Sequence, residues 1–232
     1  MSDEFDLEAA FVTAAKLLGK HNYPLDAKFK PYAGLRGTIS MEGGIIRAKI
    51  SDGYKAADLN ALTGLAIELM GKLFHTRNFD ERANIYLEEF QKLNGKGVYE
   101  LHETLRGKRG RIRKNSSKGN IFDLDALLQK VLSENSSVLT GFEKPSIVWS
   151  RYNSRRRLAF YDGAFNQVVV SRNFDSDKYP PLFLEYLIFH ELLHAKHEVK
   201  YGNRRKVHHH EFHLDEKKFP QYTEAKKILQ SI

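Results

Sequence analysis

The hydrophobic and polar positions of the chain form a pattern that occurs twice. Each half begins with helical spacing of apolar residues and continues with a strand, a turn at an acidic residue followed by glycine, and a β-branched strand. The helices open at 5–9 and 122–126, and residues 25–51 align with 145–171 without a gap. Internal similarity of this kind indicates a repeated unit. The pattern therefore predicts an α+β protein built from two copies of one small fold.

A long apolar helix closes each copy. We expect it over 59–75 in the first copy and, in the second, from the mostly apolar run 180–189 onward. The best match aligns Glu68-Leu69 with Glu191-Leu192. Residues that bind no metal then take the positions of two histidines: Ile67 for His190, and Gly71 for His194. The first copy is therefore expected to lack a metal and to serve as a scaffold or substrate-binding surface. The competing interpretation is an unrelated helical domain.

These features set the expected domain boundaries. Residues 1–105 form the first domain, which is a degenerate copy or a helical scaffold, and residues 121–232 form the second. Residues 106–120 between them are rich in Lys, Arg, Gly and Ser. That composition is typical of a flexible, strongly cationic linker.

The second long helix contains the sequence His190-Glu191-Leu192-Leu193-His194. Residues four apart lie on one face of a helix, so the two histidines can offer ring nitrogens to one metal ion while Glu191 lies beside them. Neutral imidazoles hold Zn²⁺, and a nearby carboxylate can take a proton from a water that the metal has acidified. The spacing favours a zinc-dependent hydrolase with Glu191 as its catalytic base. The alternative is a helix with two histidines at the edge of the core and an exposed glutamate.

A catalytic zinc site needs a third protein ligand. The chain has no cysteine, so histidine and carboxylate must supply it. A turn signal at Gly202-Asn203 lets the chain return toward the first two histidines. The candidates lie shortly after this turn: His208, His209, Glu211 and Glu216.

The two motifs together, HELLH and then H-x-x-E-F, resemble the SprT-like metalloproteases and their small relatives, the minigluzincins. The similarity covers about residues 122–230. In the SprT-like form the histidine that opens the second motif is the third ligand, which here is His208. His209 stands where the family usually has glycine, and gluzincin relatives take a glutamate from this helix instead, which would favour Glu211 or Glu216.

The resemblance implies a zincin-like fold, with a small β-sheet and an active-site helix, and the activity of a zinc metalloendopeptidase. It implies that three histidines hold Zn²⁺ while Glu191 polarises the attacking water: His190, His194 and His208. Tyr201 or a spare histidine could stabilise the oxyanion. The strand before the active-site helix commonly borders the cleft in zincins, so residues 167–171 are expected to pair with an extended substrate.

Charge adds a second class of partner. The net charge is +8 and the pI about 9.4, and the basic residues cluster at 106–118, 151–157 and 204–206. Clustered Lys and Arg favour salt-sensitive binding to DNA or RNA, although no aromatic side chain lies within 106–118 to stack on bases. SprT-like proteins include some that cleave protein crosslinked to DNA, so the resemblance implies a protein or peptide substrate associated with nucleic acid. The alternative is a non-catalytic nucleic-acid-binding or scaffold module with a structural zinc, which surplus histidines could complete: His209, His210 and His213.

The start of the chain is acidic and has no basic segment followed by an apolar one. No apolar run approaches the ~18 residues that a membrane span needs. We therefore expect a cytoplasmic protein that does not contact a membrane.

Overall fold

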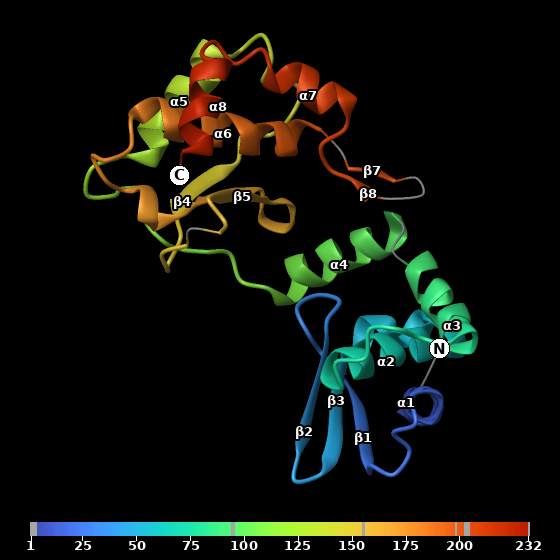
Figure 1. Cartoon of the computed structure of the whole chain (residues 1–232). Helices are drawn as coiled ribbons and strands as arrows, with labels where there is room; N and C mark the ends of the chain where they lie inside the picture. The colour runs from blue at the N-terminus through green and yellow to red at the C-terminus, as the bar shows by residue number, and fades with distance from the viewer. Residues whose placement is uncertain (1–3, 94–95, 155, 198, 202–204, 232) are drawn as a thin grey trace. The chain divides into compact units, whose positions relative to one another are not determined.

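The computed structural model describes residues 4–93, 96–154, 156–197, 199–201 and 205–231. The chain separates into two compact units, Met1–Arg111 and Ile112–Ile232, each with a hydrophobic core of its own. Unit 1 runs from blue to green in Figure 1 and unit 2 from green to red. Helices and small sheets occur in both units, so the predicted α+β class is confirmed. Within the described ranges, no helix has the length and apolar character that a membrane crossing requires.

Unit 1 begins with a helix, a three-stranded sheet and the long apolar helix. Its β2–β3 hairpin turns at Gly43 and Gly44, whose φ angles of 59° and 77° are conformations that glycine adopts without strain. The elements in chain order are α1 (Glu4–Leu17), β1 (Leu25–Lys30), β2 (Gly37–Glu42), β3 (Ile45–Ser51), the 3₁₀ turn η1 (Asp52–Ala56), α2 (Leu59–Leu73), α3 (Glu81–Lys92) and α4 (Lys96–Arg109).

Unit 2 follows the same order and then adds a short hairpin and two helices. Pro181 occupies the first turn of α6, where a missing N–H costs nothing. The elements are α5 (Leu124–Glu134), β4 (Ser146–Trp149), β5 (Ala159–Asp162), η2 (Gly163–Phe165), β6 (Gln167–Val170), η3 (Arg172–Phe174), α6 (Pro181–Lys196), β7 (Lys200–Tyr201), β8 (Arg205–Lys206), α7 (His210–Glu216) and α8 (Tyr222–Gln230).

The two larger sheets have the same topology. In each, the third strand lies in the centre, parallel to the first and antiparallel to the second, in the orders β1-β3-β2 and β4-β6-β5. The parallel pairs also share a register, because the pairing of Asp26 with Arg47 recurs 120 residues later as Ser146 with Gln167. α1 packs against β1 and α2, and α5 packs against β4 and α6. The two units therefore repeat one arrangement of helices and strands.

The second strands are displaced from this alignment. Gly37 in β2 pairs with Ile50, whereas Ala159 in β5 pairs with Val170, the residue equivalent to Ile50. β5 thus corresponds to β2 after a shift of 122 residues, from Gly37 to Ala159. Unit 2 has two residues more before this strand and two fewer after it. Because the two changes cancel, the expected gapless alignment is wrong over this strand and correct on either side.

The same displacement relates the long helices. α2 begins at Leu59 and α6 at Pro181, again 122 residues apart. In α2 the buried run from Ala61 to Gly71 is interrupted once, at Glu68, and ends before Lys72. In α6 the buried run from Phe183 to Leu193 is interrupted once, at His190, and ends before His194.

The expected sequence alignment of the two long helices is therefore wrong by one residue. Glu191 corresponds to Leu69, and both face the second strand of their sheet. Leu69 packs against Gly37, while Glu191 accepts a hydrogen bond from the N–H of Tyr161. An ion pair in unit 1 occupies the positions of the two histidines of unit 2: Glu68 with Lys72. The residues expected there are both buried instead: Ile67 and Gly71.

The structure also differs from the flexible linker expected at 106–120. The first part of this segment is the end of α4, where Arg109 pairs with Asp52 at 2.6 Å. The next part contacts β4 and β5: the backbone N–H of Trp149 donates to the carbonyl of Ser116 at 3.0 Å, and Arg113 pairs with Asp162 at 2.7 Å. Two of the basic side chains that suggested a solvated linker, Arg109 and Arg113, thus have carboxylate partners, one on each side of the boundary between the units.

Candidate metal centre and active site

Helix α6 carries the first two candidate ligands on its single polar seam. Buried apolar residues surround this seam and hold the helix against the β4-β6-β5 sheet and α5. His190 and His194 are partly buried and separated by one helical turn, so their rings project on the same side. The apolar run of the sequence thus fixes where both imidazoles lie.

His208 joins these two rings from the segment before α7. Side-chain atoms of His190, His194 and His208 that could bind a metal all lie within 4.8 Å of one another. The Nε2 atoms of His194 and His208 are 3.1 Å apart. Nitrogens at about 2.0–2.1 Å from a tetrahedral Zn²⁺ would be separated by about 3.4 Å. The donor set and its spacing therefore fit zinc, and Phe212, which is fully buried, packs against all three rings.

Burial favours the uncharged form of these ligands. It lowers the pKa of His194 to about 3, helped by the positive charges that His190 and His208 would carry if protonated. Burial and the same repulsion from His190 lower the pKa of His208. Metal binding requires neutral imidazole, so both rings are in the protonation state of ligands at neutral pH.

Glu216 fixes the orientation of the His190 ring through a contact with its Nδ1 atom. Its Oε1 atom lies 2.8 Å from Nδ1 of His190 and accepts a hydrogen bond from the hydroxyl of Tyr186 at 2.7 Å. Burial alone would raise the pKa of Glu216, but these hydrogen bonds and the charge of Lys226 hold it well below its ordinary value. The carboxylate is thus a hydrogen-bond acceptor for Nδ1–H of His190, which leaves Nε2 of this ring as the nitrogen available to a metal.

Glu191 lies beside this cluster and is almost completely enclosed. Its side chain is buried, and its Oε2 atom accepts the N–H of Tyr161 in β5 at 2.8 Å. Burial raises the pKa of Glu191, while the charges of His190 and Arg157 act in the opposite direction. A buried carboxylate with a raised pKa and a fixed position has the properties of a general base.

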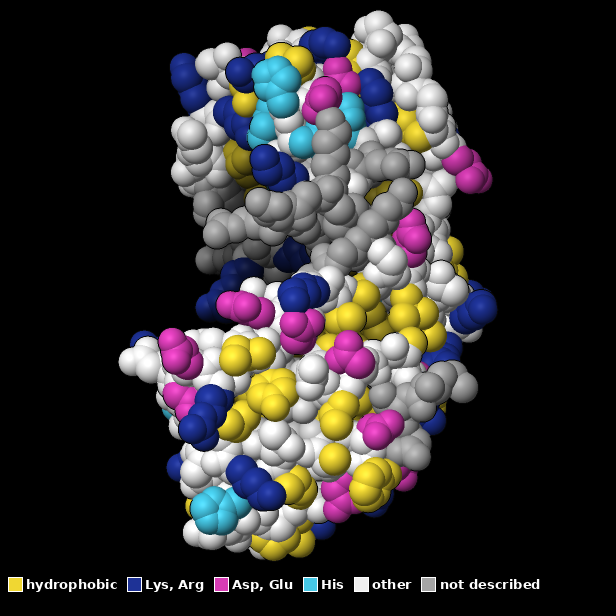
Figure 2. Space-filling model, turned by 90° about the vertical axis from the view of Figure 1, so that its right-hand side faces the viewer, with side chains coloured by type: hydrophobic (Ala, Val, Ile, Leu, Met, Phe, Trp, Pro, Cys, Tyr) yellow, Lys and Arg dark blue, Asp and Glu magenta, His cyan; other side chains and the backbone are white. Residues whose placement is uncertain are grey.

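The remaining candidate histidines lie outside the cluster of His190, His194 and His208. His209 caps the start of α7, where its Nδ1 atom accepts the N–H of Phe212 at 3.4 Å and lies 2.8 Å from Glu211. His210 and His213 are exposed. Figure 2 shows histidine side chains gathered with acidic and basic ones on one face of unit 2. The side chain of Tyr201, a candidate for stabilising an oxyanion, lies outside the described residues.

The strand expected to bind substrate is in the centre of its sheet. β6 pairs with β4 on one side and with β5 on the other, so residues 167–170 have no free edge to offer. The expectation is therefore wrong for this strand. β5 is an edge strand, and the N–H of Tyr161 points from its free side to Glu191. Strand order, which residue periodicity does not reveal, decides which strand borders the site.

Sequence reasoning missed the supporting residues. Tyr186 precedes His190 by four residues and therefore shares its helix face, a signal that was present in the sequence. Glu216 was a candidate ligand, and in the structure its carboxylate lies 2.8 Å from Nδ1 of His190, another candidate, outside the cluster of three histidines. Lys226 of α8 lies 3.4 Å from the same carboxylate, and nothing in the spacing indicated it.

A comparison with models of known protein families finds no match for this chain, and comparisons with curated proteins and with solved structures find none either. The functional argument therefore rests on the residues of the chain and their arrangement.

Proposed function

We propose that unit 2 is a zinc-dependent metallopeptidase with a zincin-like fold. The observation that carries the proposal is the convergence of three histidines beside a buried glutamate: His190, His194 and His208 beside Glu191. Among the described residues this is the one group of three or more potential ligands with metal spacing, and it contains no fourth protein ligand. Catalytic zinc sites keep such a position open, whereas structural sites normally close it.

Each residue has a distinct part in the proposed reaction. Zinc, when bound, would supply Lewis acidity for a carbonyl group and for a water molecule. Glu191 would accept the proton of that water and later deliver it to the leaving nitrogen. Tyr161 holds the Glu191 carboxylate through its backbone N–H, and Glu216 holds His190. The free edge of β5 would bind an extended peptide through main-chain hydrogen bonds, with the scissile bond near Glu191.

The repeated topology supports a second part of the proposal. We infer that unit 1 is a copy of the same fold that carries no metal. It shares the strand order, the strand directions and the parallel register of unit 2. Its ion pair of Glu68 with Lys72 cannot bind zinc as two imidazoles do.

The test is the zinc content of the purified chain and of three variants. His208→Ala should lose zinc, because two histidines on one helix do not retain it. Glu216→Ala should retain zinc with lower affinity, and the matched control His210→Ala should retain it fully, because His210 is exposed outside the cluster. Loss of zinc in Glu216→Ala with full retention in His208→Ala would indicate a glutamate ligand. Full retention in all three would reject the proposed centre.

A nucleic-acid partner is favoured by the distribution of charge. Residues 112–232 contain 20 Lys and Arg against 14 Asp and Glu, so most of the net charge of +8 belongs to unit 2. Two basic residues of the 106–118 segment are already paired with carboxylates, however: Arg109 and Arg113. We propose salt-sensitive, sequence-independent binding to DNA or RNA as an accompanying function. Titration of a labelled duplex and a single strand at several salt concentrations tests it, and no binding at low salt would reject it.

A further inference from the structure

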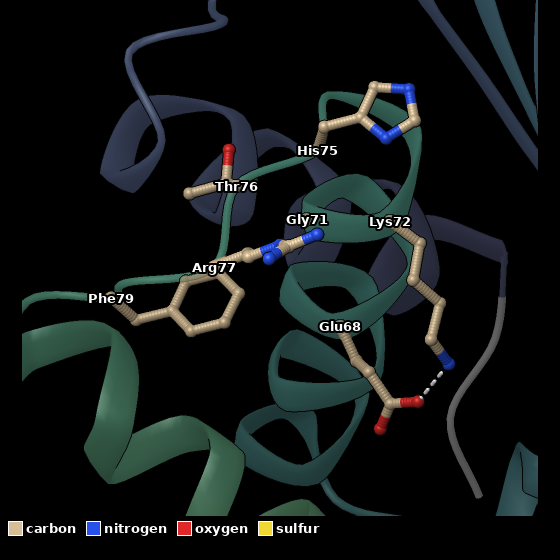
Figure 3. Close-up of a pocket in the computed structure, with 7 residues that line it drawn as sticks. All are labelled: Glu68, Gly71, Lys72, His75, Thr76, Arg77 and Phe79. Atoms are coloured by element: carbon tan, nitrogen blue, oxygen red, sulfur yellow. Dashed lines mark hydrogen bonds and ion pairs between the residues drawn. The ribbon is translucent and has the colours of Figure 1, made fainter.

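Unit 1 has a pocket on the face of α2 that corresponds to the histidine face of α6. Its volume is about 370 Å³, within the range of small-ligand sites. Two of its lining residues, Glu68 and Lys72, occupy the positions of His190 and His194. Figure 3 shows the lining residues on α2 and on the segment after it: Glu68, Gly71, Lys72, His75, Thr76, Arg77 and Phe79.

The charged groups of the pocket leave one cation available. Glu68 and Lys72 form an ion pair with each other. Arg77 is exposed and forms no ion pair with another described residue, and in Figure 3 its guanidinium extends across α2 near Gly71. A planar guanidinium binds a carboxylate through two parallel hydrogen bonds. The pocket therefore offers a binding group for a carboxylate beside an already neutralised pair.

An aromatic ring forms the apolar wall of the same pocket. The ring of Phe79 lies so close to Gly71 that a Cβ atom there would be 2.6 Å from its Cζ atom. Any larger residue at position 71 would displace the ring. The glycine thus allows Phe79 to lie over the helix, where a ligand side chain can pack against it next to the guanidinium.

The backbone at the end of α2 is strained at a residue that lines the pocket. His75 has a φ of 55°, in the left-handed region that favours glycine, and Thr76 donates its N–H to the carbonyl of Gly71 at 2.9 Å. Helices commonly end in this way with glycine at the left-handed position. A non-glycine residue costs about 1–2 kcal/mol there. Strain of this kind concentrates at binding sites, and it presents the His75 side chain at the rim.

We propose that this pocket binds a carboxylate that neighbours an apolar side chain in an extended peptide, with Arg77 on the carboxylate and Phe79 against the apolar group. The carboxylate can be an acidic side chain or the C-terminus of the peptide. Because the pair of Glu68 with Lys72 adds no net charge, Arg77 supplies a single positive charge, which matches a carboxylate better than a dianion such as phosphate. The inference deepens the proposed function, because unit 1 would hold part of a peptide substrate, but binding at Arg77 does not require hydrolysis.

The test uses the full chain with Glu191→Gln, so that hydrolysis cannot consume the peptide. The probe is the capped peptide acetyl-Ala-Ala-Phe-Asp-Ala-amide, and the readout is backbone amide NMR shifts. Shifts should concentrate at residues 68–79, and adding Arg77→Gln should weaken binding about tenfold. Arg82→Gln is the matched control, because it removes an exposed arginine on α3 that does not line the pocket. Glu68→Gln should tighten binding about threefold, because Lys72 loses its carboxylate partner and its charge then attracts the bound carboxylate.

Three further peptides identify the carboxylate. The peptide with Asn in place of Asp should bind as weakly as the Arg77→Gln variant binds the original. A peptide that ends in Phe with a free carboxylate, compared with its amide, shows whether the terminus is accepted. Equal binding of the Asp and Asn peptides, equal effects of the Arg77 and Arg82 variants, or shifts confined to unit 2 would overturn the proposal. Inorganic phosphate that reproduces the shifts at 68–79 while the peptides do not would also overturn it. Zinc content and hydrolysis are measured separately, so failure here is distinct from failure of the proposed function.

Discussion

Units 1 and 2 place two side chains, four residues apart, on the same seam of the same helix. In unit 2 they are His190 and His194, and in unit 1 they are Glu68 and Lys72, which neutralise each other. One residue along, the buried Glu191 of unit 2 corresponds to the apolar Leu69. The common fold supplies the positions, and very few side chains decide whether the seam can hold a metal. The comparison therefore separates what stabilises this fold from what its candidate chemistry requires.

The units also differ in how the long helix begins. Asp58 caps α2 by accepting the N–H of Ala61 at 2.8 Å. α6 has no side-chain cap and starts at two prolines. The loop before it directs Asp175 to the backbone N–H groups of the segment before α5 instead, at distances of 2.6–3.1 Å. A local cap in one unit is thus replaced by a longer-range contact in the other.

Exchanging the two side-chain pairs between the long helices should have the largest effect on zinc binding. His190→Glu with His194→Lys copies the unit 1 pair into unit 2, and we expect zinc binding and peptide hydrolysis to be lost entirely while far-UV circular dichroism is unchanged. The reciprocal change, Glu68→His with Lys72→His, should not create a stoichiometric zinc site, because the described part of unit 1 has no counterpart of the hairpin and helix that position His208. Zinc measured in each double variant checks both statements. Zinc retained in the variant His190→Glu with His194→Lys would contradict the proposal that these two side chains distinguish the units.

Glu191→Gln should lower kcat by about 10²–10⁴-fold while zinc remains bound, because the amide cannot accept a proton. The amide oxygen can still accept the N–H of Tyr161, so the thermal unfolding temperature should change little. Turnover of a generic peptide substrate and zinc content are measured on the same sample. Turnover at the wild-type level would exclude Glu191 as the base.

Glu216→Gln should weaken zinc binding by about 10–100-fold, because His190 loses a charged acceptor for its Nδ1 proton. Competition with a chromophoric chelator measures the change. Glu211→Gln is the matched control, since Glu211 is exposed and contacts His209, which lies outside the cluster of three histidines. An equal effect of both variants would indicate a general charge effect and not a specific contact.

Asp175→Asn should destabilise unit 2 by about 1.5–3 kcal/mol, whereas Asp58→Ala should cost unit 1 about 1 kcal/mol. Burial acts to raise the pKa of Asp175, but hydrogen bonds from three backbone N–H groups outweigh it and lower the pKa below its ordinary value of 3.8. The stabilisation is therefore complete above about pH 5 and is lost as the pH falls through the lowered pKa. Denaturant unfolding at several pH values checks this. A difference from wild type that grew in acid would contradict it.

The periodicity of the sequence was enough to predict the α+β class, most of the strands and the repeat. It could not reveal that two residues gained before β5 are lost after it, because the flanking segments still align. It also missed α4, whose polar composition and terminal Arg-Gly sequence resemble a linker. The helical spacing predicted that His190, Glu191 and His194 lie together. The contact of Glu216 with His190 depends on how α7 folds back across 26 residues, which spacing does not encode.

The hairpin strands β7 and β8 lie in the chain between two of the candidate ligands, His194 and His208, which are 14 residues apart. A shared ion would thus act as a cross-link that closes a loop of that length. The entropy of closing such a loop corresponds to on the order of 2 kcal/mol. Binding of such an ion and docking of the segment that leads into α7 would therefore favour each other.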